Sequence, residues 1–487
     1  MPEDVLTPRE AIQEDKSFKR SLSLLDATMV VAGSMIGSGI FIVSADITRN
    51  VGSAGWLLFV WLITGFMTLV AAVSYGELSG MFPKAGGQYV YLKEAYNPFI
   101  SFLYGWSLFA VIQTGTIAAV GVAFSKFTAY LIPALSEDNI LLNAGWLKIS
   151  AAQIVSIVLI VLLTWNNTRG IKEGKIIQTL FTSAKLLSLF GLIIFGLFAL
   201  KPDVWGANWN NAWEIGQGKV IGSDAASGWT VLPYAGVGAI MGAIAASMVG
   251  SVFSSDAWNN VTFIAGEIKN PKRNVPIAIM AGVGIAMTLY VLLNYAFMQV
   301  LPVSELAAID ENNIAAAVVA GTLMGKAGTV VIAVLIMICT FGAVSGCIIV
   351  YPRIYYRMAQ ENFFFKKAAN VHPAFRTPYV SLIFSMIWSS ILVISGTFDL
   401  LTNLVIFAGF FFYALLAIGL IRMKRKGLIT SKVTGYPVIP FIVILFSLAL
   451  IVNTVIVQPQ QSLAGLFLVL IGVPFYYYFK RKYSNIK

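Results

Sequence analysis

Charged residues are scarce in this chain. Only 11% of its 487 residues are Asp, Glu, Lys or Arg, whereas an average soluble domain has about 25%, and 58% are hydrophobic. This composition excludes an ordinary soluble globular protein and predicts an all-α integral membrane protein in a lipid bilayer.

Cysteine and histidine are scarcer still, with two residues and one residue. Cys339 and Cys347 fall in the same apolar segment, so neither is placed to form a disulfide outside the membrane. His372 follows in a polar loop and has no thiols or carboxylates converging on it to complete a metal site. We therefore expect no disulfide framework, no metal and no cofactor, and the sequence has no catalytic cluster that would indicate a membrane enzyme.

A removable signal peptide is also missing, because the first residues are polar and charged. We expect residues 1–25 to form a cytoplasmic N-terminal segment. Twelve apolar runs then reach the roughly 20 residues needed to cross a bilayer. They lie near residues 26–48, 54–76, 98–126, 149–168, 176–200, 231–260, 275–300, 328–352, 378–397, 400–421, 437–457 and 462–479.

The net charge of +11 does not indicate a nucleic-acid partner. Most of the 33 Lys and Arg residues lie in loops that face inward if the termini are inside, as in the run RMKRK at residues 422–426. The positive-inside rule explains the excess. We predict a multi-pass protein of the cell membrane with both termini cytoplasmic.

The first span contains the run AGSMIGSGIF, which places Gly33, Gly37 and Gly39 at membrane depth. A glycine in a helix interior costs about 1 kcal/mol relative to alanine, and an opened helix in lipid leaves peptide groups without partners. One interpretation is that the span unwinds here at a binding site. The alternative is that Gly33 and Gly37 form a small-residue contact between helices.

The sixth span supports the first interpretation, because glycine, serine and aspartate cluster between residues 250 and 256. Interrupted spans at corresponding positions of two halves are typical of secondary transporters with inverted repeats. We predict that residues 26–200 form the first repeat and residues 231–422 the inverted one. Residues 201–230 would form an extracellular loop, and residues 423–487 the last two spans and a cytoplasmic C-terminus.

The two breaks offer complementary groups. Unwinding of the first span exposes backbone N–H groups and a helix N-terminus to an anion, while the second break offers carbonyls to a cation, so that a zwitterion fits between them. The candidate substrate-binding residues are Met35, Ile36, Gly37, Ser38 and Gly39 in the first break and Phe253, Ser254 and Asp256 in the second.

Ionisable and polar side chains inside the spans are further candidates. Lys185 lies about 15 Å along its helix from Lys175, too deep to reach water. It can replace a bound sodium ion by bridging the broken first helix to its neighbours, carry a proton, or serve a purely structural role. Asp256 either contacts the substrate or caps the second half of its span. Possible pocket-lining residues are Gln113, Thr116, Asn259, Ser345 and Asn403.

Three stretches resemble a known family. GSMIGSGIF in the first span, SYGELSGMFPKAGGQYVYLKEAYNPFISFLYGW after the second and SVFSSDAWNNVTFIAGEIKNPKRNVPIAI across the sixth are similar to the amino acid–polyamine–organocation superfamily. Within it, the chain resembles the L-type amino acid transporters. The resemblance extends over all twelve spans. It implies twelve transmembrane helices in the leucine-transporter fold, with a five-plus-five inverted repeat and broken helices one and six.

The resemblance also implies roles for individual residues. Ser38 and Gly39 match the residues that meet the substrate carboxylate. The carbonyls of Met35, Phe253 and Ser254 match those that meet the amine, and Phe253 also matches the aromatic gate.

Lys185 matches the fifth-span lysine that replaces a second sodium ion in sodium-independent relatives. Two features depart from the family pattern. The loop PALSEDNILLNAGWLK lacks the cysteine that bonds animal members to a heavy chain, so we expect a bacterial, light-chain-like protein that is a monomer or homodimer. Ser255 and Asp256 replace a frequent Tyr-Gly pair, which makes the pocket more polar and suits small neutral or dibasic amino acids.

The sequence therefore predicts a secondary active transporter of L-amino acids, a sodium-independent exchanger that works by alternating access and favours small neutral substrates. The alternatives within this class are a proton-coupled symporter that uses Lys185 and an exchanger of dibasic amino acids. A channel or a substrate-sensing receptor on the same scaffold is the alternative from another class. A channel would pass net current without trans substrate, and a sensor would need a signalling domain that neither terminus is long enough to supply.

Overall fold

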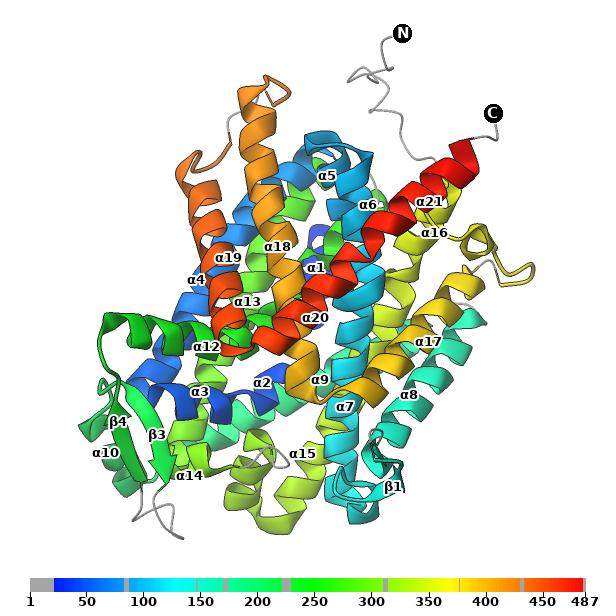
Figure 1. The fold of residues 1–487 in the computed structure, drawn as a ribbon. Coiled ribbons are helices and arrows are strands. Elements are labelled where there is room, and N and C mark those ends of the chain that lie inside the picture. Colours follow the sequence, from blue (N-terminus) through cyan, green and yellow to red (C-terminus); the bar gives the residue numbers. More distant parts are fainter. Residues whose placement is uncertain are drawn as a thin grey trace.

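A computed structural model describes residues 22–82, 87–145, 148–169, 174–220, 229–309, 314–375, 377–429 and 433–484. The side chains of residues 174–184, 220 and 483–484 lie outside this description. Most of the described chain is helical, and two short hairpins are the only strands in it (Figure 1).

Helices of the first half follow the five predicted spans. The first span is divided into three, and the third includes a π-helical turn. The elements are α1 (Leu24–Met35), α2 (Gly39–Ile42), α3 (Ser44–Val51), α4 (Ala54–Met81), α5 (Gly87–Ala95), α6 (Pro98–Ser107), η2 (Leu108–Ile112), α7 (Gln113–Leu131), α8 (Ala151–Thr168) and α9 (Gly174–Phe198).

Helices of the second half follow the remaining predicted spans. The elements are α12 (Val237–Ser255), the 3-10 helix η4 (Trp258–Glu267), α13 (Pro271–Val300), α15 (Ala315–Val350), α16 (Pro352–Gln360), α17 (Tyr379–Ser395), α18 (Phe398–Arg425), α19 (Val438–Val457), α20 (Pro459–Leu470) and α21 (Gly472–Ser484).

All twelve predicted segments coincide with helical structure, but the count of twelve spanning helices is only partly met. Within the described ranges, nine helices are long and apolar enough to cross a membrane, or ten if residues 185–198 and α10 (Pro202–Asn210), bent by 95°, form one span. The helices α1 and α17 are apolar but have 12 and 17 residues. The first span falls short because it is interrupted after Met35.

Local sequence signals define several helix starts. Ser23 and Asp26 form a reciprocal capping box at the start of α1. Ser150 and Gln153 do the same for α8. Asn97 accepts a hydrogen bond from the Ile100 N–H directly before a proline at the first position of α6. These side chains satisfy backbone donors that a helix start leaves without partners.

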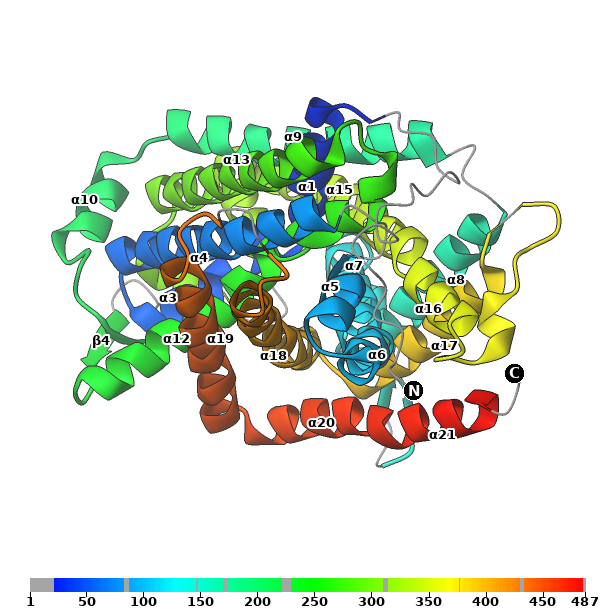
Figure 2. The ribbon, with the colours of Figure 1, turned by 90° about the horizontal axis from the view of Figure 1, so that it is seen from above.

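The packing of the helices has the two-fold pattern expected of two repeats of five spans. Helix α1 of span one packs on α13 of span seven, and α12 of span six packs on α4 of span two. In the same way α9 of span five packs on α15 of span eight, and α18 of span ten on α7 of span three. If each span of the first half is exchanged with its counterpart in the second half, the first of these pairs becomes the second, and the third becomes the fourth. The last two helices, α20 and α21, run along one edge of the molecule (Figure 2).

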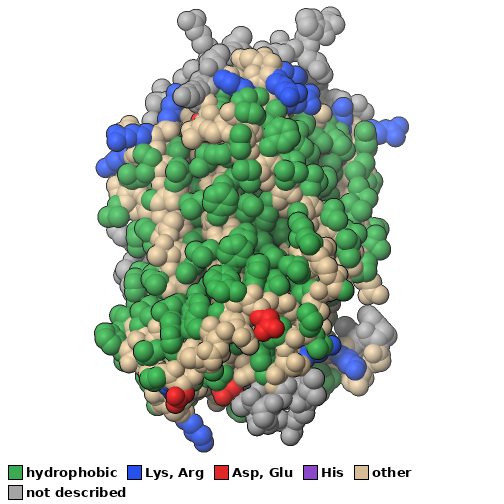
Figure 3. All heavy atoms as spheres, turned by 90° about the vertical axis from the view of Figure 1, so that its left-hand side faces the viewer, with side chains coloured by type: hydrophobic (Ala, Val, Ile, Leu, Met, Phe, Trp, Pro, Cys, Tyr) green, Lys and Arg blue, Asp and Glu red, His purple; other side chains and the backbone are tan. Residues whose placement is uncertain are grey.

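The two ends of the bundle differ in charge. Helices α18 and α21 both end at the upper end in Figure 1, and their last turns are rich in Lys and Arg. Lys and Arg side chains gather at this end in the space-filling view (Figure 3). We call it the basic side. Here the Leu22 N–H donates to the Glu267 carbonyl at 3.0 Å and the Lys269 N–H to the Leu22 carbonyl at 2.9 Å, which joins the start of the first span to the end of η4.

The opposite side carries short connecting elements. They are the hairpin of β1 (Ile140–Asn143) and β2 (Lys148–Ser150), the hairpin of β3 (Gly216–Val220) and β4 (Trp229–Pro233), α10 and α14 (Val303–Ala308) (Figure 1). The Trp56 ring packs edge-on against Trp213 and donates from Nε1 to its carbonyl at 3.0 Å. Trp213 is 65% exposed, as expected of an amphipathic ring at a membrane interface.

Candidate substrate site

The first span is broken where its glycines predict. Helix α1 ends at Met35, residues 36–38 are not helical, and α2 begins at Gly39. Ser38 lies in this gap, and its side-chain oxygen is buried without a hydrogen-bond partner. A buried hydroxyl without a partner is costly, so this atom is available to a ligand.

The sixth span is broken a little later than the glycine and serine cluster suggests. Helix α12 continues to Ser255, Asp256 is extended, and Ala257 adopts a left-handed conformation with φ of 70° before η4 begins. The hydroxyls of Ser254 and Ser255 donate to the carbonyls of Gly250 and Ser251 within the helix, at 2.8 and 2.6 Å.

The two breaks touch. A Cβ atom added to Gly39 would lie 3.0 Å from the Ser254 Cβ and would overlap its hydroxyl, so a side chain at position 39 has no room. A Cβ on Gly37 would meet only the Met35 carbonyl of its own segment, at 3.8 Å. The proposed small-residue contact between helices is therefore wrong for Gly37, whereas Gly39 allows the first and sixth spans to approach each other closely.

A tyrosine that the sequence analysis did not single out joins the two breaks. The Tyr290 hydroxyl on α13 lies 2.7 Å from the carbonyl oxygen of Met35 and 3.1 Å from that of Ser254. Tyr290 is completely buried, and its ring packs edge-on against Trp61 at 5.4 Å between centroids. Tyr290 thus links the ends of α1 and α12.

Lys185 contacts the first span directly. Its ammonium donates to the Gly33 carbonyl at 3.1 Å, and its side chain is 6% exposed. Ser188, one turn further along α9, contacts the thiol of Cys339 on α15 at 3.7 Å. Lys185 therefore joins α9 to the last turn of α1, which is the geometry that a bridging role requires. Its part in coupling stays a prediction.

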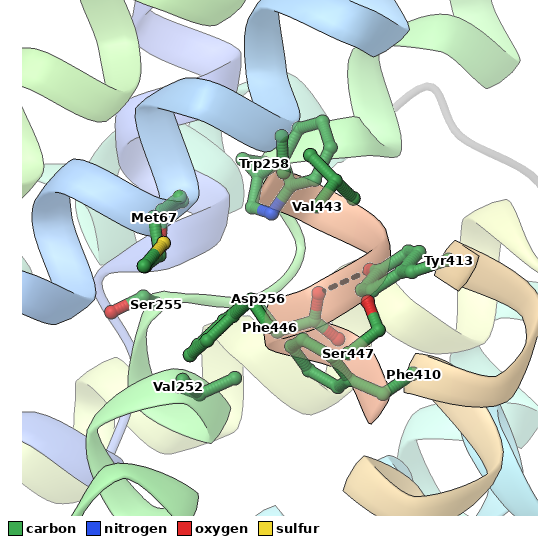
Figure 4. A pocket seen from close by; sticks show the side chains of 12 residues that line it. Met67, Val252, Ser255, Asp256, Trp258, Phe410, Tyr413, Val443, Phe446 and Ser447 are labelled. Carbon is green, nitrogen blue, oxygen red and sulfur yellow. Dashed lines mark hydrogen bonds between the residues drawn. The ribbon is translucent and has the colours of Figure 1, made fainter. Parts of the chain in front are cut away.

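The Asp256 side chain is bonded to the tenth span. The residue before η4 is Ala257, and no side-chain capping bond is present there. The Tyr413 hydroxyl on α18 donates to Asp256 Oδ1 at 2.6 Å (Figure 4). Asn259 Nδ2 donates to the Tyr413 oxygen at 2.8 Å. This chain of bonds directs the carboxylate toward α18, and both the capping role and the substrate contact of Asp256 stay predictions.

A small cavity lies where Asp256 and Tyr413 meet. Residues of α4, α12, α18 and α19 line it together with Trp258 (Figure 4). It has room for about one water molecule, since its free volume is about 20 Å³ for centres of a water-sized sphere. Ser447 contributes a buried hydroxyl without a partner. This cavity is too small for an amino acid.

The candidate gate lies against another aromatic ring. The Phe253 ring meets the Phe398 ring of α18 edge-on, with centroids 5.8 Å apart. Phe253 is 9% exposed and belongs to the last two turns of α12. This packing places an apolar contact beside the second break, and the gating role stays a prediction.

The remaining pocket candidates differ in whether their polar atoms have hydrogen-bond partners. Gln113 begins α7 directly after the π-helical turn η2, and its Oε1 is buried without a partner. The Thr116 hydroxyl is bonded to the Ile112 carbonyl at 2.7 Å, and Ser345 accepts from Asn167 at 3.4 Å. Asn403 is half-buried near the start of α18. Gln113 is therefore the member of this group with a free buried polar atom.

Nearly the whole chain is similar to known amino acid transporters. The family model described as amino acid permease matches residues 22–477. The chain is 28% identical to the serine/threonine exchanger SteT of Bacillus subtilis over 477 residues, which cover 97% of this chain and 99% of that protein.

Two human proteins are also similar. The b(0,+)-type amino acid transporter 1 is 28% identical over 472 residues, covering 96% of this chain and 90% of that protein. The large neutral amino acids transporter small subunit 2 is 27% identical over 464 residues, covering 95% and 80%.

Proposed function

This chain belongs to the amino acid permease family, and on that premise we propose that it exchanges small neutral L-amino acids across the cell membrane by alternating access, without sodium. The similar proteins named above are transporters and an exchanger of amino acids, not enzymes. Serine and threonine, the substrates in the name of the Bacillus subtilis relative, are the first candidates.

The buried Ser38 hydroxyl carries this proposal. It has no partner of its own, and it lies in the break whose neighbouring α1 ends in the Met35 carbonyl. The Tyr290 hydroxyl lies within hydrogen-bond distance of both the Met35 and the Ser254 carbonyl oxygens, so the Ser254 carbonyl also lies near this break. A donor hydroxyl in the first break, together with acceptor carbonyls at the ends of α1 and α12, suits the carboxylate and the ammonium of one amino acid. We therefore assign the carboxylate to Ser38 and the N-terminus of α2, and the ammonium to the two carbonyls.

The surroundings favour a small, uncharged side chain. Gly39 and Ser254 are in close contact, and the ring of Phe253, the residue before Ser254, packs against Phe398. The Asp256 carboxylate already accepts a hydrogen bond from Tyr413 and points into a cavity of water-molecule size. That cavity has no room for the side chain of a dibasic amino acid. We place the dibasic alternative second for this reason.

The contact of Lys185 supports a mode of coupling without sodium. Its ammonium supplies a fixed positive charge between α9 and the end of α1, where a bound sodium ion would otherwise hold the broken helix. We favour exchange over proton symport because the similar protein of Bacillus subtilis is named an exchanger.

The charge distribution suggests an orientation. We assign the basic side to the cytoplasm, because positively charged loops stay inside. Both cysteines lie in α15, Cys339 buried and Cys347 half-buried, so neither is placed on a loop to bond a heavy chain. We propose that the protein works without a disulfide-linked subunit, as a monomer or homodimer.

Competition for uptake tests the substrate and the site together. Uptake of labelled L-serine into proteoliposomes should be inhibited by L-serine, L-threonine and L-alanine and much less by L-lysine and L-arginine. Ser38→Ala should raise the KM for L-serine about tenfold, because a hydrogen bond to a charged group is lost, with no loss of thermal stability since Ser38 has no internal partner. Stronger inhibition by L-arginine than by L-threonine would contradict the proposal.

A further inference from the structure

Ser447 has a buried hydroxyl that its own helix does not use. It lies near the middle of α19, is completely buried, and its side-chain oxygen has no hydrogen-bond partner. A serine in a membrane helix can donate to a carbonyl one turn back, as Ser247 of α12 does to Ala243 at 2.8 Å. Because a buried hydroxyl without a partner is costly, the Ser447 hydroxyl is available to a group outside α19.

The Asp256 carboxylate faces the same cavity. Ser447 and Asp256 both line it, and their side chains lie together with Tyr413 in the close view (Figure 4). No hydrogen bond joins Ser447 to Asp256, whose Oδ1 accepts from Tyr413 instead. A carboxylate has about four acceptor positions, and Tyr413 fills one of them. A donor and an acceptor therefore border one small space without a bond between them.

The size and the lining of this cavity match one water molecule. A water needs about 10–15 Å³ of space open to its centre and two to four polar partners. The cavity has about 20 Å³. Its lining also includes Thr68 and Ser255, which donate their hydroxyl protons to carbonyls of their own helices at 2.7 and 2.6 Å and keep oxygens that can accept a bond.

We propose that one water molecule is bound in this cavity and bridges Ser447 of α19 to Asp256 at the second break. The water accepts the Ser447 proton and donates one of its own to the carboxylate, so both buried groups gain a partner. A metal ion cannot accept the serine proton. The bridge ties the broken sixth span to α19, which lies outside the two predicted repeats. This inference does not rest on the proposed function, because no substrate takes part in it.

A structure of the wild-type protein in lipid nanodiscs, at a resolution that shows ordered waters, tests the proposal directly. We expect one peak that lies about 2.6–3.2 Å from the Ser447 oxygen and from an Asp256 oxygen. If waters are seen elsewhere inside the bundle but not here, the proposal is overturned. A direct bond between Ser447 and Asp256 would overturn it as well.

Thermal unfolding of variants tests the bridge independently. We expect Ser447→Ala and Asp256→Ala each to lower the unfolding temperature by about 2 °C or more. Since the two side chains are not bonded to each other, the effect of Ser447→Ala should fall by at least half in the presence of Asp256→Ala only if something between them couples them. Fully additive effects would contradict the bridge.

Two further variants keep this test decisive. Ser247→Ala is the matched control, because Ser247 is also buried but bonded within α12, and its effect should be the same with and without Asp256→Ala. If Asp256→Ala does not fold, Ser447→Val is used instead. Its larger apolar side chain displaces the water, so it should be less stable than Ser447→Ala. A Ser447→Val protein at least as stable as Ser447→Ala would overturn the proposal.

Replacement of salt separates a water from a cation. Unfolding temperatures of the wild type should be equal in sodium chloride and in choline chloride at the same ionic strength. A stabilisation by sodium that the wild type has and Ser447→Ala lacks would overturn the proposal and identify a cation site. These measurements need no transport, so a protein that takes up no L-serine would contradict the proposed function and leave this inference as it stands.

Discussion

The Lys185 ammonium lies 3.1 Å from the Gly33 carbonyl oxygen, so a buried positive charge on α9 is bonded to the last turn of α1 just before that helix breaks. An ammonium at membrane depth is costly unless it has such partners. The contact gives the first break a fixed cation on one side, while Tyr290 supplies a neutral donor on another. The broken span is thus held by two side chains from different helices.

Replacing this lysine should disable transport without destroying the fold. Lys185→Met removes the charge and the bond to Gly33, and we expect L-serine uptake to fall more than tenfold, since the end of α1 loses its anchor. Lys201→Met, at an exposed position after α9, is the matched control and should behave as wild type. Uptake by Lys185→Met close to the wild-type rate would contradict the bridging role.

The same variant tests the proton-coupled alternative. If Lys185 carried a proton, wild-type uptake would follow an imposed pH gradient and Lys185→Met would lose that dependence. We expect wild-type uptake to be indifferent to the gradient at constant membrane potential, because exchange of one neutral amino acid for another moves no net proton.

Substitution of Gly39 should damage both stability and transport. An alanine methyl group at this position overlaps Ser254, whose hydroxyl is itself bonded to Gly250, and overpacking of this kind typically costs about 1–3 kcal/mol. Gly37→Ala is the matched control, because its methyl group meets no atom of another helix. Thermal unfolding in detergent should separate the two variants by several degrees. Equal unfolding temperatures would show that the two breaks are not in contact.

Neutralising Asp256 should be tolerated. Asp256→Asn retains an oxygen that accepts from Tyr413, so we expect uptake of L-serine to stay within about threefold of wild type. Tyr413→Phe, by contrast, leaves the carboxylate and Asn259 without their shared partner and should lower stability by about 1–3 kcal/mol. A complete and selective loss of transport in Asp256→Asn, with normal folding, would instead mean that the carboxylate contacts the substrate.

A cluster on the basic side should influence transport rate more than stability. Glu361, which follows α16, accepts from the Tyr89 hydroxyl at 3.0 Å and from Lys93 at 3.1 Å, both on α5, and from Arg357 at 3.4 Å. Partly exposed ion pairs contribute about 0–1 kcal/mol, so Glu361→Gln should lower the unfolding temperature only slightly. Because the cluster joins α5 to α16, we expect the exchange rate to change at least twofold, whereas exposed Glu214→Gln should have no effect.

The broken helices were predictable because their signals are local. Gly33, Gly37 and Gly39 indicate a break, and the structure has one at residues 36–38. The second break falls after the predicted cluster, since Ser254 and Ser255 bond to carbonyls one turn back and keep α12 helical to its end. Serine can satisfy the backbone within a helix as well as end it, and composition does not distinguish the two.

The contacts of Tyr290 and Tyr413 were not predictable in the same way. Tyr290 is 255 residues from Met35 in the sequence, and Tyr413 is 157 from Asp256. Each tyrosine lies in an apolar run in which aromatic residues usually serve packing, so its hydroxyl carries no local signal. Only the arrangement of α13 and α18 against the two breaks shows their partners.

Exchange itself is tested most directly in proteoliposomes without sodium, by uptake of labelled L-serine with and without unlabelled L-serine inside. We predict that uptake requires internal amino acid and is indifferent to an imposed proton gradient. Equal uptake into empty vesicles, driven by a proton gradient or dependent on added sodium, would contradict the exchanger and identify a symporter.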